Sequence, residues 1–196
     1  MHASFFPSGD EEPPPETEPV PKPWWQPPAD EFPARVQVRE FLARTPGAVI
    51  VVSHVDVFSI GMTIQIDWEV RRLEQSLSDW RSMLQGDHFS PTPEMLRFGV
   101  ALANGATVTT VDRRGPDAFT TEPAGWSLMN TQGGGGGGDR RYSGATGLWL
   151  WPLPPSGPIE LVGEWAARGV PESRIVLDGA ALLERVVDVQ PLWPDG

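Results

Sequence analysis

Apolar and polar residues alternate without a break over residues 62–71 of this chain. The apolar positions in this stretch are Met62, Ile64, Ile66, Trp68 and Val70. A period of two places alternate side chains on opposite faces of a β-strand. Because strands inside a parallel sheet are apolar on both faces, the pattern predicts an antiparallel strand with one face in water.

Two hairpins are predicted around this stretch. Residues 48–57 are rich in β-branched side chains, and a short turn-forming segment separates them from the alternating stretch. A second hairpin joins residues 95–102 to residues 106–111 through Asn104-Gly105, which supplies the positive φ that a tight turn requires. Later short strands are predicted at residues 126–131, 142–151, 159–165 and 174–177.

Two short helices complete the predicted elements. Leucines and a tryptophan recur at helical spacing within residues 73–85, and Asp178 can cap a helix over residues 179–187. Because no strand–helix–strand unit repeats, the sequence predicts an all-β fold, an immunoglobulin-like antiparallel β-sandwich with one or two short helices.

The chain has no cysteine, so a sandwich of this kind would lack the disulfide that joins the sheets of antibody domains. We expect Trp68, Trp149 and Trp165 to fill that part of the core. The absence of cysteine also excludes thiolate catalysis and cysteine-ligated metal, and is compatible with a reducing compartment.

Residues 1–35 are predicted to be a disordered, acidic, proline-rich tail, and residues 36–196 to be the β-sandwich domain. Ten of the 22 prolines fall within residues 1–33, among seven acidic residues and one lysine, a composition that favours an extended polyproline-II-like chain. Trp24 and Trp25 have two interpretations. Either they fold back onto the domain, or they form a linear motif that an aromatic groove of a partner binds.

Charge argues against two classes of partner. The 26 acidic and 15 basic residues give a formal net charge of -11, whereas nucleic acids and anionic membranes are bound by clustered Lys and Arg. No apolar run approaches the roughly 18 residues of a membrane span. Histidine pairs at metal spacing and nucleophile motifs are also missing, so no metal, cofactor or catalytic residue is predicted.

An unbroken run of six glycines, residues 133–138, is the least ordinary feature of the sequence. Ordering such a run is costly in entropy, so a flexible hairpin loop is the interpretation that we favour. The alternatives are a surface around Gly135 and Gly136 that another backbone can approach closely, and a phosphate-binding loop. Arg140 and Arg141 make a positive spot directly after the run.

Trp149 and Trp151 occupy alternate positions of a predicted strand and therefore share one of its faces. They are predicted either to pack in the core or to form an exposed aromatic platform for a sugar, a peptide or a proline-rich ligand. The proline-rich tail of the same chain can also lie across them.

Acidic residues at alternate strand positions offer an enzymatic alternative. Glycoside hydrolysis needs two carboxyl groups that flank one substrate, and the sequence provides four candidates on two strands. They are Asp67, Glu69, Glu160 and Glu164. This alternative requires the carboxylates to converge in one pocket beside Trp149 or Trp165.

The glycine run followed by the segment W-P-L-P-P-S-G-P, residues 151–158, resembles a family of uncharacterised proteins common in high-GC actinobacteria. The likeness covers about residues 36–188, and the 14 arginines against one lysine fit a GC-rich coding bias. The resemblance implies a cytoplasmic protein and assigns no catalytic residues.

The sequence therefore predicts a non-enzymatic module that binds a protein partner of unknown identity. The candidate binding residues are Trp24, Trp25, Gly135, Gly136, Arg140, Arg141, Trp149 and Trp151. A small-molecule or carbohydrate-active enzyme that uses strand carboxylates and tryptophan platforms is the alternative.

Overall fold

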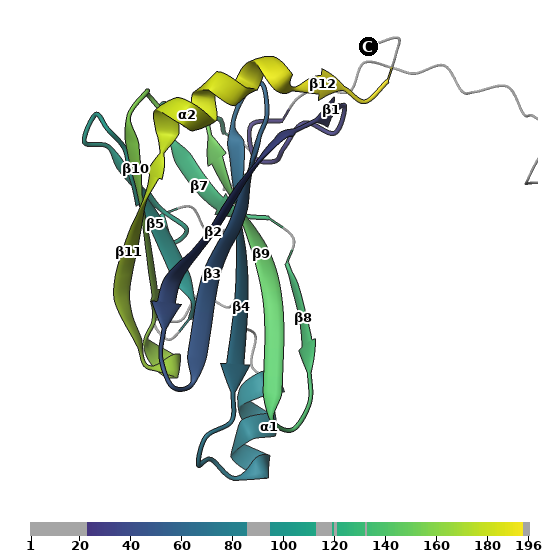
Figure 1. Cartoon of the computed structure of the whole chain (residues 1–196), viewed down its shortest axis with the longest axis vertical. Helices are drawn as coiled ribbons and strands as arrows, with labels where there is room; N and C mark the ends of the chain where they lie inside the picture. The colour runs from purple at the N-terminus through teal and green to yellow at the C-terminus, as the bar shows by residue number, and fades with distance from the viewer. Residues whose placement is uncertain (1–22, 86–94, 113–118, 120, 132, 194–196) are drawn as a thin grey trace, which may run out of the picture.

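Two antiparallel β-sheets packed face to face form the body of the protein (Figure 1). The computed structural model describes residues 23–85, 95–112, 119, 121–131 and 133–193. The predicted antiparallel β-sandwich with short helices is confirmed. The immunoglobulin-like arrangement of its strands stays a prediction.

The larger sheet has the strand order β2-β3-β4-β9-β7, and β8 also pairs with β9. Its strands are β2 (Ala34–Arg44), β3 (Ala48–Val57), β4 (Met62–Arg71), β7 (Ser127–Asn130), β8 (Gly134–Gly137) and β9 (Arg141–Trp151). The bounds of β3 and β4 are those predicted from the sequence. Strand β7 pairs with the upper end of β9, and β8 pairs with its lower half.

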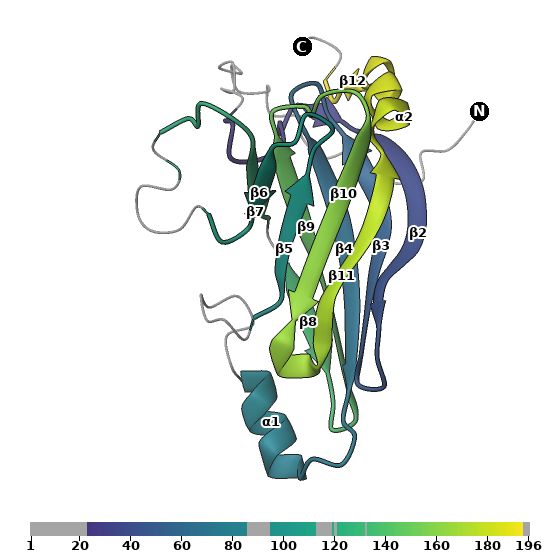
Figure 2. The same ribbon diagram turned by 90° about the vertical axis from the view of Figure 1, so that its left-hand side faces the viewer.

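The smaller sheet has the order β11-β10-β5-β6 and faces the viewer in Figure 2. Its strands are β5 (Arg97–Ala101), β6 (Thr107–Thr109), β10 (Pro158–Trp165) and β11 (Val170–Asp178). Gly105 has a φ of 84°, as the predicted turn between β5 and β6 requires. Strand β2 lies beside β11 and β6 beside β7, so the two sheets meet along both sides of the sandwich.

The apolar positions of residues 62–71 all point into the space between the sheets. Met62, Ile64 and Ile66 are inaccessible to solvent, and burial of each such side chain contributes about 1.5–3 kcal/mol. Trp68 meets Trp165 of the smaller sheet edge to face, with ring centroids 5.2 Å apart. These two tryptophans fill the core as predicted.

Short elements cover the two ends of the sandwich. Helix α1 (Leu77–Gln85) lies at the lower end, below β9, and the single turn η2 (Ala166–Arg168) joins β10 to β11 (Figure 1). Helix α2 (Gly179–Glu184) and the turn η3 (Arg185–Asp188) lie across the upper end. The Asp178 side chain caps α2 by accepting a hydrogen bond from the backbone of Ala181 at 3.1 Å.

The folded body begins before the predicted domain boundary at residue 36. Strand β1 (Glu31–Phe32) pairs with β12 (Gln190–Pro191), β2 begins at Ala34, and Trp24 is buried. Residues 23–35 therefore belong to the sandwich, because their apolar and backbone groups find partners on it. Residues 1–22 of the predicted tail lie outside the described residues.

Candidate functional site

The glycine run forms a strand at the edge of the larger sheet, so the favoured interpretation as a flexible loop is wrong. Residues 134–137 pair in antiparallel register with residues 142–145 of β9. The glycines of β8 do not use the positive φ values that glycine permits. Figure 1 shows β8 at the outer margin of the sheet, beside the lower half of β9.

Every second residue of β8 has no room for a side chain. A Cβ atom on Gly135 would lie 2.8 Å from the Tyr142 ring and 2.9 Å from the carbonyl oxygen of Ser143, and one on Gly137 would lie 2.6 Å from Tyr142 Cα. Gly134 and Gly136 face open space. Glycine is therefore required on one face of β8, whereas larger residues fit on the other.

Aromatic rings occupy the space beside the crowded face of β8. Tyr142 stacks on Trp68 with ring centroids 5.8 Å apart and an interplanar angle of 24°. Trp68 in turn lies against Gly144, where a Cβ atom would overlap Cζ2 of its ring. The aromatic stack thus extends the core beneath β8 and holds the glycine strand against β9.

The backbone groups of β8 point alternately toward β9 and away from it. The N–H of Gly138 donates to the carbonyl of Arg141 at 2.8 Å, which makes these two residues a hydrogen-bonded pair. Because such pairs alternate with non-bonded pairs in an antiparallel ladder, Gly135 and Gly137 direct their N–H and C=O groups away from β9. No strand in the described part of the chain pairs with that side of β8.

We call this outer side of Gly134–Gly137 the glycine edge. Helix α1 supports its lower end, where the Trp80 indole Nε1 donates to the carbonyl of Gly138 at 2.9 Å. Arg140 and Arg141 follow in the turn and at the start of β9, and both side chains are exposed. Arg141 lies 3.5 Å from the Glu69 carboxylate. The structure therefore brings Gly135, Gly136 and both predicted arginines together.

Trp149 is neither an exposed platform nor a filler between the sheets. Its neighbours Leu148 and Leu150 face the core, so Trp149 points to the outer face of the larger sheet. It is nevertheless only 1% exposed, because Phe58 meets it edge to face at 5.7 Å and residues near Trp24 cover it. Its indole Nε1 donates to the Trp24 carbonyl at 2.8 Å.

The other three predicted tryptophans join the same outer cluster. Trp24 is 7% exposed and packs on Trp151, with ring centroids 6.0 Å apart. Trp25 meets Trp24 edge to face at 5.8 Å and remains 37% exposed. Of the two interpretations of this pair, folding back onto the domain is confirmed for Trp24.

The four carboxylates of the enzymatic alternative do not converge. Glu160 and Glu164 line a hollow of about 400 Å³ on the outer face of the smaller sheet. Asp67 and Glu69 line a shallow hollow of about 630 Å³ on the outer face of the larger sheet. The two pairs thus lie on opposite sides of the sandwich, which overturns the predicted single pocket.

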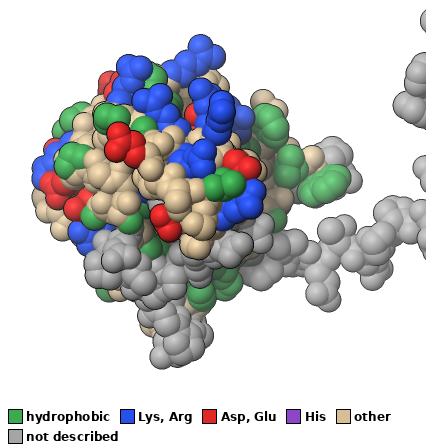
Figure 3. All heavy atoms as spheres, turned by 90° about the horizontal axis from the view of Figure 1, so that it is seen from below, with side chains coloured by type: hydrophobic (Ala, Val, Ile, Leu, Met, Phe, Trp, Pro, Cys, Tyr) green, Lys and Arg blue, Asp and Glu red, His purple; other side chains and the backbone are tan. Residues whose placement is uncertain are grey.

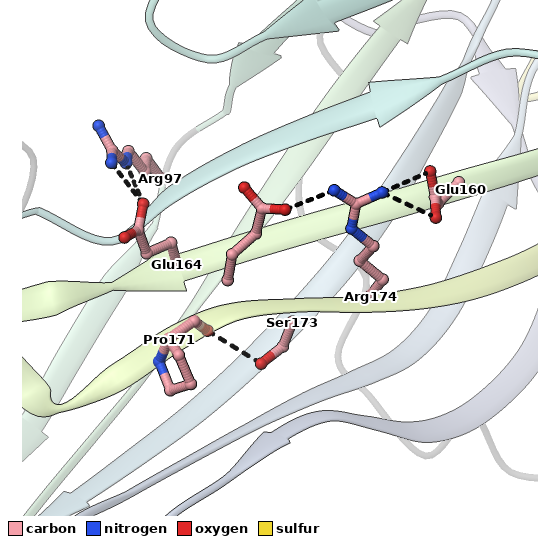
Figure 4. A network of polar contacts seen from close by, with 7 residues as sticks. Arg97, Glu160, Glu164, Pro171, Ser173 and Arg174 are labelled. Atoms are coloured by element: carbon pink, nitrogen blue, oxygen red, sulfur yellow. Dashed lines mark hydrogen bonds and ion pairs between the residues drawn. The ribbon is translucent and has the colours of Figure 1, made fainter.

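Arginines hold the two glutamates of the smaller sheet (Figure 4). Glu164 forms an ion pair with Arg97, and Glu160 accepts hydrogen bonds from Arg174 at 3.3 Å. Hydrogen bonds with Glu172 and Glu160 raise the pKa of Arg174 above its ordinary value. Both arginines that line this hollow are therefore paired with glutamates.

His54 and Asp56 lie two residues apart on β3, and their half-buried side chains approach each other, with Nε2 and Oδ2 3.6 Å apart. The Asp56 carboxylate is also bound by Arg35 through two hydrogen bonds of 2.7 and 2.8 Å, which raise the pKa of the guanidinium. Within the described residues no group of His, Asp and Glu side chains is arranged to hold a metal ion.

Comparisons with protein-family models, with curated proteins and with solved structures give no match. The resemblance to an actinobacterial family therefore stays a prediction. None of the helices in the described segments has the length and apolar character that crossing a membrane requires.

Proposed function

We propose that this protein is a non-enzymatic binding module that takes up an extended segment of a partner protein at the glycine edge. The observation that carries the proposal is the open backbone of Gly135 and Gly137 on a strand without side chains. Each of these two residues offers one donor and one acceptor to an added strand.

The glycine edge lacks the features that keep sheet edges from pairing with other chains. Natural edges carry charged side chains, proline or bulges, or are covered by other elements. Residues 134–137 carry no side chain and pair with β9 without a bulge. An incoming strand can therefore approach the backbone of β8 without steric hindrance from this strand.

The structure also reduces the entropic cost that makes glycine a poor strand residue. A glycine strand that ordered only on binding would cost about 0.5–1 kcal/mol per residue more than alanine. Here β9 and the Trp80 contact at Gly138 hold β8 in place before a partner arrives. A partner thus meets an edge that is already ordered, which favours affinity.

Arg140 and Arg141 give the expected partner some chemical character. Both lie beyond the lower end of β8 and are exposed. Backbone hydrogen bonds provide affinity in strand addition, while side-chain contacts provide specificity. We therefore expect an extended segment without proline at alternate positions, with an acidic residue near these arginines. We also propose that the protein works in the cytoplasm, because its own sequence has no cysteine and is therefore compatible with a reducing compartment.

Two alanine variants of identical composition test the proposal. Gly135→Ala/Gly137→Ala places Cβ atoms against β9 and displaces β8, whereas Gly134→Ala/Gly136→Ala places them in open space. Peptides selected from a random displayed library on the wild-type protein serve as probes. We expect the first variant to lose at least about tenfold in affinity and the second to bind within about twofold of wild type.

Hydrogen exchange locates the bound peptide. Amide protons of Gly135 and Gly137 are expected to exchange rapidly in the free protein and to become protected when peptide binds. Equal peptide affinity for both alanine variants, or protection elsewhere without protection at these two glycines, would contradict strand addition at the glycine edge.

A further inference from the structure

The lower end of the sandwich is basic although the chain as a whole is acidic. We define the basic end as residues 44–47, 71–85, 138–141 and 166–169. These segments contain seven arginines and three carboxylates among the described residues. The arginines are Arg44, Arg71, Arg72, Arg81, Arg140, Arg141 and Arg168. Figure 3, a view of this end, shows Lys and Arg side chains gathered on the surface.

Backbone contacts bring these distant segments together. The N–H of Arg71 donates to the Gly47 carbonyl in the β2–β3 turn at 2.9 Å, and the N–H of Arg72 donates to the Arg140 carbonyl at 2.9 Å. A cavity of about 370 Å³ lies between the β2–β3 turn, α1 and η2, and Arg71 and Arg168 line it. The basic end is therefore one continuous surface.

Several of these arginines retain capacity to bind an anion. Arg81 pairs with Asp139 at 3.0 Å, and Arg141 lies near a glutamate of β4. Among the carboxylates that the structure describes, none lies within ion-pair distance of Arg44, Arg72 or Arg140. Arg72 and Arg140 are half-buried and exposed at this end, and the exposed Arg44 has its guanidinium 4.1 Å from the centre of the Phe41 ring.

We propose that the basic end docks the acidic segment of this chain's own N-terminal tail, residues 10–18. This segment reads DEEPPPETE, with five carboxylates and no basic residue. Opposite charges of this density attract across a Debye length of about 10 Å at 0.1 M salt. The proposal does not depend on strand addition at the glycine edge.

The length of the tail matches the distance that it must cover. The Trp24 carbonyl accepts a hydrogen bond from Trp149, which places the beginning of the folded chain there, and Arg141 lies eight positions before Trp149 on β9. At about 3.3 Å per residue this distance is about 26 Å. A polyproline-II chain rises about 3.1 Å per residue, so in that conformation Glu16 would reach about 22 Å and Glu12 about 34 Å from Pro23. A tail of this length can therefore bring its acidic segment to the basic end.

Tethering favours this occupant over a separate acidic molecule. A short linker gives an attached segment an effective concentration in the millimolar range. Three consecutive prolines, residues 13–15, also restrict the free chain and lower the entropy lost on docking. A free acidic peptide must therefore reach a millimolar concentration to compete with the attached tail for the basic end.

Spin labels can measure the docking in the full chain, because the sequence has no native cysteine. Ser8→Cys places one label beside the acidic segment, and Ser82→Cys places the other on the exposed side of α1. We expect a population of short inter-label distances at about 20 mM salt that falls at least fivefold at about 500 mM salt.

Matched neutral variants test the carboxylates. Glu11→Gln/Glu12→Gln/Glu16→Gln removes three charges from the tail and is expected to reduce the short-distance population at least fivefold. The control Glu40→Gln/Glu122→Gln/Glu184→Gln removes three exposed charges from outside the basic end and is expected to leave it unchanged. An equal effect of both variants would overturn the proposal.

Matched variants also test the arginines. Arg72→Gln/Arg140→Gln is expected to reduce the short-distance population, and Arg39→Gln/Arg185→Gln is expected to leave it unchanged. A population that survives high salt, or that both variants reduce equally, would overturn the proposal. A mixture of singly labelled chains gives the last control. Short distances in that mixture would place the tail on a second copy and overturn docking within one chain.

Discussion

Adjacent tryptophans allow a sharp test of where the folded body begins. Trp24 is 7% exposed and Trp25 is 37% exposed, so Trp24→Ala and Trp25→Ala make the same chemical change in two environments. An aromatic side chain of this kind buries about 150–250 Å², which at about 25 cal/mol per Å² corresponds to about 4–6 kcal/mol. Measured Trp→Ala changes in cores cost about 3–5 kcal/mol.

We expect Trp24→Ala to lower the free energy of unfolding by about 3 kcal/mol. This value lies at the low end of the range, because the segment can detach instead of leaving a cavity. Trp25 keeps a large exposed fraction and one edge-to-face contact with Trp24, so Trp25→Ala is expected to cost about 1 kcal/mol. If residues 23–35 were a tail without contacts, neither change would be measurable.

Thermal unfolding of the full chain measures the difference. At about 2–4 °C per kcal/mol for a protein of this size, Tm is expected to fall by about 6–12 °C in Trp24→Ala and about 2–4 °C in Trp25→Ala. The Trp149 indole proton, which donates to the Trp24 carbonyl, gives a local measurement and is expected to exchange faster in Trp24→Ala. Equal Tm shifts, or unchanged exchange of this proton, would refute the reasoning.

Three further substitutions have expected outcomes. Gly144→Ala places a Cβ atom that overlaps the Trp68 ring, and this overpacking is expected to cost about 1–3 kcal/mol in chemical denaturation. Trp80→Phe removes the donor to the Gly138 carbonyl and is expected to cost about 1 kcal/mol and to speed amide exchange in α1. Glu164→Gln breaks an exposed ion pair and is expected to change the free energy of unfolding by less than about 1 kcal/mol, with a smaller effect at high salt.

Local sequence patterns predicted most of the sandwich. Strict alternation gave the bounds of β4, and Asn104-Gly105 gave the turn whose glycine has a φ of 84°. The capping aspartate at residue 178 likewise marks the start of α2. In each case the decisive interactions lie within a few residues along the chain, so they are visible in the sequence.

The glycine edge was not predictable in the same way. Glycine has low β-propensity and no side chain, so a run of it contains no alternation to indicate a strand. The strand forms because β9 offers a backbone ladder, and because Tyr142 and Gly144 leave space that only glycine fills. The one sequence feature that hints at this pairing is Gly144, a glycine between larger residues of β9.

The role of Trp149 depended on packing as well. Its position two residues from Trp151 predicted correctly that both share a strand face. Which face meets the second sheet is set by Leu148 and Leu150, and the outer face is closed by Phe58 and Trp24 from elsewhere in the chain. A residue can therefore be buried without belonging to the core between the sheets.

The sequence by itself determined the strand class, the main hairpins and the acidic net charge, because these depend on composition and on neighbours in the chain. Tertiary structure alone decided that residues 134–137 present an ordered edge and that arginines from four separate segments form one basic end. It also decided that the four strand carboxylates face opposite sides. The physical reason is that backbone ladders and charge clusters arise from segments that meet only after the two sheets have packed.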